Sequence, residues 1–109
     1  MSTHRGLHEA SFLILTSLAG SSQHGYAIIT DVQELSGGRV TLRAGTLYAA
    51  LDRLSGDGLI ETEKEEIVQN RLRRYYRITH HGAEVLRQEA TRLEANARAA
   101  MTRLRPGVV

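Results

Sequence analysis

The sequence of 109 residues contains no cysteine, no tryptophan, one proline and one phenylalanine. Without cysteine the chain can form no disulfide, no thiolate metal site and no cysteine nucleophile, which fits a reducing compartment. No apolar run approaches the roughly 20 residues needed to cross a bilayer, and the segment MSTHRGLHEA lacks the basic-then-apolar pattern of a signal peptide. We therefore expect a cytoplasmic protein that does not associate with membranes.

The residue patterns of catalytic and metal sites are also missing. There is no Ser-His-Asp order, no glycine-rich phosphate loop and no pair of catalytic carboxylates. His80 and His81 are adjacent, and His4 and His8 could share one helix face, but no carboxylate pattern completes a metal site. We predict that the protein is not an enzyme, binds no metal and needs no cofactor.

The charges are more informative in their distribution than in their sum. The formal net charge is +2, with a pI of about 9.4, and the hydrophobic and charged fractions (41% and 24%) are those of one ordinary small domain. Residues 61–66 read ETEKEE, whereas residues 71–77 read RLRRYYR with four arginines and no acid. Such a basic patch is typical of a phosphate-binding surface, although arginine could also simply keep an exposed strand soluble.

Apolar spacing predicts two helices in the first third of the chain. In residues 7–19, the apolar or small side chains that share one helical face are Leu7, Ser11, Ile14, Leu15 and Leu18. In residues 22–35, the corresponding positions are Tyr26, Ile29, Val32 and Leu35, with Ile28 beside them. Ser22 could cap the second helix, and Gly37-Gly38 would end it because glycine readily takes positive φ.

A third helix followed by a hairpin is predicted in the middle of the chain. Thr41 is a plausible N-cap, and the inward stripe is Leu47, Leu51 and Leu54. The side chains expected to lie away from this stripe are Arg43, Thr46, Ala50 and Arg53. After a turn at residues 55–58, two strands are expected around a turn at residues 68–70. A helix followed by a basic two-stranded ribbon is the layout of a winged helix-turn-helix, in which the helix enters the DNA major groove.

Residues 83–104 show a heptad repeat that predicts a long amphipathic helix. The repeat positions are Ala83, Ala90, Ala97 and Leu104, together with Leu86, Leu93 and Ala100. A thin apolar stripe favours pairing with a second subunit, or packing against residues 7–18 of the same chain, and we expect both. The predicted fold is mainly α (α+β): a winged helix-turn-helix with a three-helix DNA-binding core, a two-stranded β wing and a C-terminal dimerisation helix. We expect the DNA-binding domain at 1–79, the dimerisation helix at 80–105 and a tail at 106–109.

Three motifs in order make the chain similar to a known family. HGYAI at 24–28, GTLYAALDRLSGDGLIE at 45–61 and NRLRRYYRITHHG at 70–82 resemble the PadR family of bacterial transcriptional regulators. The resemblance covers nearly the whole chain and matches the short branch of the family, which has a single C-terminal helix. Departures from the family pattern are Ala49 in place of proline, Asn70 and Leu72 around the wing arginine, and Arg74 in place of lysine.

The resemblance implies a homodimeric DNA-binding regulator, usually a repressor, that binds a pseudo-palindromic operator and responds to a small-molecule effector. The residues expected to contact DNA are Thr41, Arg43, Thr46, Tyr48, Arg53, Arg71, Arg73 and Arg74. Tyr48 could instead be a core aromatic residue. Strand alternation lets only some of the three wing arginines point at DNA.

Two other functions remain open at this stage. The same surface could bind an acidic protein, since the net charge is only +2. The chain could also be mainly a ligand sensor. Because tryptophan is absent, a drug cannot be sandwiched between stacked tryptophans as in some short family relatives, so an effector pocket would have to use Phe12, tyrosines and aliphatic residues.

Overall fold

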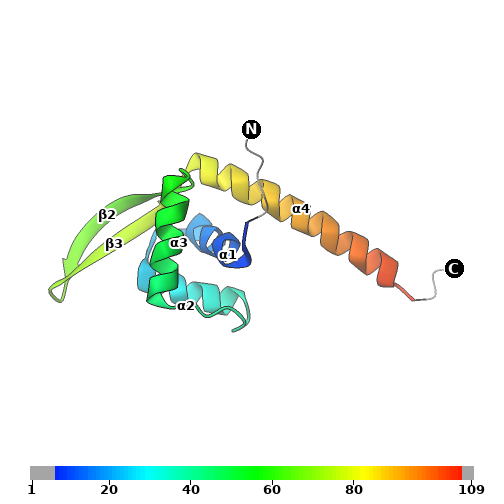
Figure 1. The fold of residues 1–109 in the computed structure, drawn as a ribbon, viewed down its shortest axis with the longest axis horizontal. Helices are drawn as coiled ribbons and strands as arrows, with labels where there is room; N and C mark the ends of the chain where they lie inside the picture. Colours follow the sequence, from blue (N-terminus) through cyan, green and yellow to red (C-terminus); the bar gives the residue numbers. More distant parts are fainter. Residues whose placement is uncertain (1–6, 107–109) are drawn as a thin grey trace.

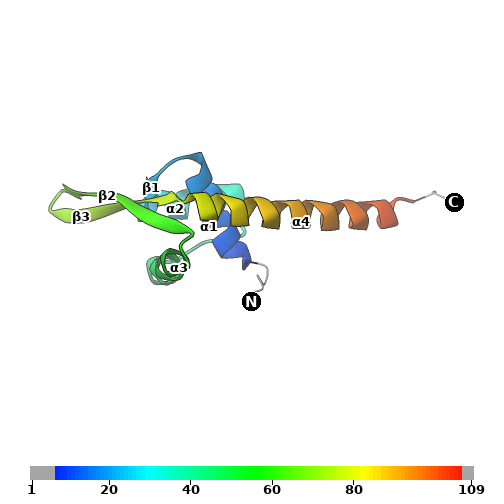
Figure 2. The same cartoon turned by 90° about the horizontal axis from the view of Figure 1, so that it is seen from above.

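The computed structural model describes residues 7–106, which form four helices and a three-stranded antiparallel sheet. The order is α1 (Glu9–Gly20), β1 (Gln23–His24), α2 (Gly25–Leu35), α3 (Ala44–Gly56), β2 (Ile60–Val68), β3 (Arg71–Ile78) and α4 (His80–Leu104). Figures 1 and 2 show the first three helices gathered together, with the β2–β3 hairpin and α4 projecting from them in opposite directions. None of the helices in this part of the chain is long and apolar enough to cross a membrane.

The core lies where α1, α2 and α3 meet the base of the hairpin and the start of α4. Its apolar members are all less than one tenth exposed: Ile14, Leu15, Leu18, Ile28, Val32, Leu42, Leu47, Ala50, Leu51, Leu54, Leu59, Ile60, Tyr76 and Val85. The predicted inward face of α1 and the Leu47/Leu51/Leu54 stripe of α3 are therefore confirmed. Burying side chains from every helix in one cluster fixes the relative positions of the helices.

Two predictions about helix faces are wrong. Ala50 is only 5% exposed, because it follows Leu47 by three residues and joins the same buried stripe. Tyr26 and Leu35, both expected on the apolar face of α2, are 76% and 47% exposed. The buried side of α2 contains Val32 of the predicted face together with Ile28, so it is rotated away from Tyr26.

The two predicted N-caps are also wrong, and for the second helix the reason lies in the sheet. Gln23 and His24 pair with Tyr76 and Tyr75 as a short third strand, which the sequence pattern did not indicate. This pairing keeps residues 23–24 extended, so α2 begins at Gly25 and its N-cap is His24 rather than Ser22. Thr41 does not cap α3 either: the N-cap position is Arg43, without a side-chain hydrogen bond.

The hairpin confirms the predicted wing and its turn. β2 and β3 pair from Ile60↔Ile78 out to Val68↔Arg71, with one irregularity between Thr62 and Lys64. Gln69 and Asn70 both have positive φ (53° and 64°), as in the tight two-residue turn that matches strand twist. The strand order β1-β3-β2 leaves the long wing extending well beyond the helices (Figure 1).

Helix α4 is attached rigidly to the base of the wing. It begins at His80, three residues before the heptad pattern begins, because the Thr79 side chain caps it by accepting from the amide of Gly82 (2.9 Å). The Thr79 hydroxyl donates to the carbonyl of Gly58 (2.7 Å). A Cβ at Gly82 would lie 2.0 Å from the carbonyl oxygen of Leu59, so only glycine allows this close packing. The whole arrangement is a winged helix-turn-helix followed by a long helix, as the sequence predicts.

Candidate nucleic-acid interface

A groove of about 600 Å³ lies between the wing and the starts of α2 and α3. At the start of α2 it is lined by His24, Gly25 and Tyr26, and on α3 by Tyr48. The wing contributes Val68, Gln69, Arg71, Leu72, Arg73 and Arg74. Three separate parts of the sequence therefore form one surface rich in arginine and tyrosine. Guanidinium groups suit phosphate oxygens, and tyrosine hydroxyls can add hydrogen bonds to the same backbone.

The residues predicted on and before α3 are all accessible, but they do not form one cluster. Thr41, Arg43, Thr46 and Arg53 are exposed and lie outside the groove, whereas Tyr48 lines it and is 47% exposed. Helical periodicity places Tyr48 on the flank toward the wing and Thr46 and Arg53 on the opposite flank. Tyr48 is thus not a core residue, and the alternative prediction that its ring is buried in the core is wrong.

The outermost strip of α3, opposite its buried stripe, carries the small residues Gly45 and Ala49, followed by Asp52. All three are exposed, and nothing lies within 4 Å of where a Cβ on Gly45 would be. The first turns of this helix therefore present backbone and small side chains to the surroundings. A large molecule can approach this part of the helix closely.

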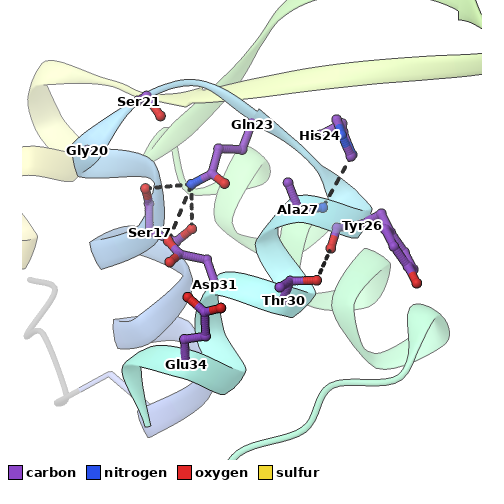
Figure 3. A pocket seen from close by; sticks show the side chains of 10 residues that line it. All are labelled: Ser17, Gly20, Ser21, Gln23, His24, Tyr26, Ala27, Thr30, Asp31 and Glu34. Carbon is purple, nitrogen blue, oxygen red and sulfur yellow. Dashed lines mark hydrogen bonds between the residues drawn. The ribbon is translucent and has the colours of Figure 1, made fainter. Parts of the chain in front are cut away.

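Tyr26 is a candidate contact residue that the sequence interpretation missed. It projects from the first turn of α2 (Figure 3) and lines the groove beside Tyr48. The Tyr48 hydroxyl lies against Gly25, where an added Cβ would come within 2.5 Å of it. The usable signal was the HGY triplet itself: a glycine between two ring side chains lets a second aromatic residue pack against the helix start.

The wing arginines divide into two classes. Arg74 donates to Glu65 (2.8 Å) and Arg77 to Glu61 (2.7 Å), both across the β2–β3 pair. Within residues 7–106, neither Arg71 nor Arg73 forms a salt bridge. Of the three predicted wing arginines, the exposed Arg71 and the half-buried Arg73 both line the groove without a salt-bridge partner, whereas the charge of Arg74 is partly neutralised by Glu65.

His24 connects the wing to the start of α2. Its Nδ1 accepts a hydrogen bond from the amide of Ala27 (3.3 Å, Figure 3), and its ring meets that of Tyr75 edge-on, with centroids 5.4 Å apart. The Tyr75 hydroxyl donates to Glu66 (2.8 Å), and Lys64 Nζ lies 4.7 Å from the Tyr75 ring centroid. Burial lowers the pKa of His24, and the charge of Arg73 lowers it further, while Glu66 opposes the shift.

We expect the fold to lose stability when the solution becomes acidic enough to protonate His24. The pKa of His24 is lower in the folded chain than its ordinary value of 6.5. Between these two pKa values the unfolded chain therefore binds more protons than the folded chain. The stabilisation is complete above 6.5 and is lost as the pH falls through the folded-state pKa. His24→Asn, which keeps an N-cap oxygen but cannot titrate there, should flatten this dependence.

The measurement is urea unfolding at about pH 7.5 and about pH 5.5, on either side of the ordinary histidine pKa. His81→Asn is the matched control, since His81 is exposed on α4. It should retain the stability difference of the parent. An equal loss in the His24→Asn variant and the parent would show that another group controls the acid sensitivity.

A second hollow of about 600 Å³ lies between the end of α1 and α2 (Figure 3). The Gln23 amide fills part of it by donating to the carbonyl and hydroxyl oxygens of Ser17 (2.9 and 2.7 Å). Neither this hollow nor the groove is lined by Phe12, which is half-buried on α1. Of the two histidines considered above as sharing a helix face, His8 is the residue before α1 and His4 lies outside the described residues.

The heptad positions of α4 differ in burial along the helix. Ala83 and Leu86 are half-buried near α1, which packs against α4. From Ala90 to Pro106 every residue is exposed, including the remaining heptad positions Ala90, Leu93, Ala97, Ala100 and Leu104. Leu93 and Leu104 are 41% and 73% exposed. The far half of this helix thus carries an apolar stripe that no segment among residues 7–106 covers.

Comparison with known proteins gives a consistent match. The profile of the transcriptional regulator PadR-like family matches residues 14–88. The transcriptional regulator Rv3488 of Mycobacterium tuberculosis is 41% identical over 85 residues, which is 78% of this chain and 76% of that protein. The chain spans only 22% to 41% of the length of other curated relatives that it matches.

Solved structures share the fold. A PadR family transcription regulator from Clostridium difficile R20291 superposes with a TM-score of 0.72 at 23% identity, covering 88% of this chain and 97% of that one. Bacillus subtilis PadR, solved in complex with operator DNA, superposes with a TM-score of 0.66 at 22% identity, covering 74% of this chain and 47% of that one.

Proposed function

Because this chain belongs to the PadR-like family of transcriptional regulators, we propose that it is a cytoplasmic homodimeric repressor. It binds a pseudo-palindromic DNA operator and is released from it by a small-molecule or other effector. The observation that carries the DNA-binding part is the groove in which Arg71 and Arg73 of the wing face the starts of α2 and α3. The B. subtilis relative solved with operator DNA supports the same assignment.

The proposed mode of binding follows from the shape of the interface. Helix α3 enters the major groove with Gly45 and Ala49 toward the bases, so that the helix comes close to their edges. Arg43, Thr46 and Arg53, with Thr41 just before the helix, contact bases or phosphates along its flank. Tyr48 and Tyr26 bind the backbone beside the wing. Arg71 and Arg73 bind phosphates, or the narrow minor groove next to the site.

The proposed dimer uses the exposed stripe of α4. Alanine at most of its heptad positions lets two helices approach closely, while Leu93 and Leu104 supply most of the apolar area. Two subunits then present two α3 helices about 34 Å apart, or a multiple of that spacing, as successive major grooves require. The part of α4 beyond Ala90 has no other covering segment among residues 7–106.

The proposed release mechanism rests on the rigid joint at Thr79. Because α4 is hydrogen-bonded to the base of the wing, a change in the angle between the paired α4 helices also moves the wings and α3 helices. An effector that binds one dimer geometry more tightly shifts the population toward it. If that geometry has the wrong spacing for the operator, DNA is released.

The first experiment is fluorescence anisotropy with labelled DNA from upstream of the protein's own gene, with a scrambled duplex as control and salt as the variable. Tight binding to the upstream DNA alone, weakening steeply with salt, is the expected result. Equal weak binding to upstream and scrambled DNA, together with capture of an acidic protein by the same surface, would support the interaction-module alternative instead.

Replacing Arg71 and Arg73 together by alanine should weaken binding to all duplexes about 10- to 100-fold. Each lost phosphate contact reduces the slope of log K against log salt by about 0.9, so the slope should become shallower by about 2 per subunit. Titrations of the parent and variant at several salt concentrations measure both effects.

The matched control is the double alanine variant of Arg103 and Arg105, which removes the same charge at the far end of α4. Its affinity and salt slope should stay close to those of the parent. If both double variants behave alike, the effect of the wing substitutions comes from net charge and not from phosphate contacts.

A further inference from the structure

The tip of the wing carries two large apolar side chains that face solvent. Ile67 is 75% exposed and Leu72 is 59% exposed. They are direct cross-strand partners, one step before the pair Val68↔Arg71 that closes the turn. Cross-strand partners lie on the same face of a sheet, so the two side chains form one small apolar patch.

Charged side chains surround this wing-tip pair, Ile67 and Leu72, on both faces of the hairpin. The next pair toward the base on the same face is Glu65 and Arg74, which neutralise each other in a salt bridge. The opposite face carries Arg71 and Arg73, which form no salt bridge in the described chain, since Glu66, opposite Arg73, accepts a hydrogen bond from Tyr75. Figures 1 and 2 show the tip of the hairpin far from every helix, and the exposure of Ile67 and Leu72 shows that no described segment covers them.

We propose that the wing-tip pair packs against the deoxyribose walls and base edges of the DNA minor groove. This inference rests on the proposed DNA-binding function and extends it to two residues outside the predicted contact set. Although Leu72 lies on the other face of the hairpin from Arg71 and Arg73, it lines the same groove, so the apolar patch borders the basic surface at the tip of the wing. When these arginines reach the phosphates at the groove edge, the narrow two-residue turn brings the tip to the groove itself.

The chemistry of the minor groove fits such a pair. Proteins that enter this groove commonly combine arginine with apolar side chains that contact sugars and base steps. An A·T pair presents only acceptors there, whereas guanine adds its 2-amino donor. An apolar side chain at the floor leaves that amino group without a partner. The wing-tip pair should therefore disfavour guanine beneath the wing.

The test uses two duplexes of about 30 base pairs, long enough for two half-sites. They are identical except that one contains dG·dC pairs and the other dI·dC pairs, which differ only by the 2-amino group in the minor groove. We expect the parent to bind the dI·dC duplex about 10-fold more tightly. The variant with Ile67→Ala and Leu72→Ala should lose most of this preference and about 10-fold in affinity. Its salt slope should be unchanged, since no charge is removed.

Leu35→Ala is the control for loss of exposed apolar surface, because Leu35 is 47% exposed at the end of α2. An unchanged affinity and preference in the wing-tip variant would overturn the inference. So would a change in its oligomeric state by sedimentation, since the pair would then contact another copy of the chain. If the parent binds DNA through Arg71 and Arg73 but the wing-tip variant matches it, only this inference fails. If the parent shows no salt-dependent DNA binding, the proposed function itself fails.

Discussion

Replacing Gly45 by leucine is expected to reduce operator affinity about 10- to 100-fold while the protein stays fully folded. Gly45 lies on the outermost strip of α3, and a Cβ built there meets nothing within 4 Å. The folded chain can therefore accept a side chain at this position. In the proposed complex the same space belongs to the DNA, and a leucine would push the helix away from the base edges. Losing one good base contact costs about 1–3 kcal/mol.

The stability of the Gly45→Leu variant should not fall with its affinity for DNA. Glycine is a poor helix former, so the unfolding free energy of the Gly45→Leu variant should be unchanged or higher by up to about 0.8 kcal/mol. Gly45→Ala provides a graded step, with a smaller loss of affinity and a similar stability. Urea unfolding and anisotropy titrations on the same preparations separate the two effects. Parent-like affinity in the leucine variant would mean that α3 does not approach DNA with this face.

Introducing carboxylates into the stripe of α4 is expected to produce a monomer. In the variant with Leu93→Glu and Ala97→Glu, two charges per subunit would have to be buried against two others in the paired helices. In the single chain both positions are exposed, so the fold of each subunit should survive. A monomer binds only one half-site at a time and loses the effective concentration of the second. Affinity for a two-half-site operator should fall about 100-fold or more.

The matched control is the variant with Ala95→Glu and Ala99→Glu. It adds the same charge to exposed positions on the same helix, outside the heptad stripe. Sedimentation equilibrium should show this control as a dimer and the stripe variant as a monomer. A stripe variant that still sediments as a dimer, or a control that dissociates equally, would place the subunit contact elsewhere on the chain.

Local patterns in the sequence predicted most of the architecture, because each depends on short-range periodicity. The Leu47/Leu51/Leu54 spacing predicted the buried face of α3, and the heptad from Ala83 predicted the length of α4. Charge patterning predicted a basic second wing strand, and the three motifs predicted the family. In each case the residues that carry the signal lie within a few turns or within one strand pair.

Long-range contacts decided the features that were missed or misplaced. Pairing of Gln23 and His24 with β3 moved the start of α2 by a few residues and made His24, not Ser22, its cap. The face that α2 buries, with Ile28 and Val32, is turned away from Tyr26, which is exposed. Ala50 is buried because α3 packs against its neighbours with a wider face than the leucine stripe. A two-residue strand has no periodicity of its own, so its partner strand alone could reveal it.

The candidate site shows the same division most clearly at the wing. Composition alone gave four arginines in residues 71–77 without any means of ranking them. The paired strands rank them, because Arg74 and Arg77 form salt bridges with Glu65 and Glu61 across the strand pair. Among residues 7–106 neither Arg71 nor Arg73 forms one: Arg71 lies opposite Val68, and Glu66, which lies opposite Arg73, accepts a hydrogen bond from Tyr75. Sequence by itself determined the fold class, the family and the basic wing. Only the tertiary structure decided which charges remain available and which side chains share the groove, since both depend on segments brought together by folding.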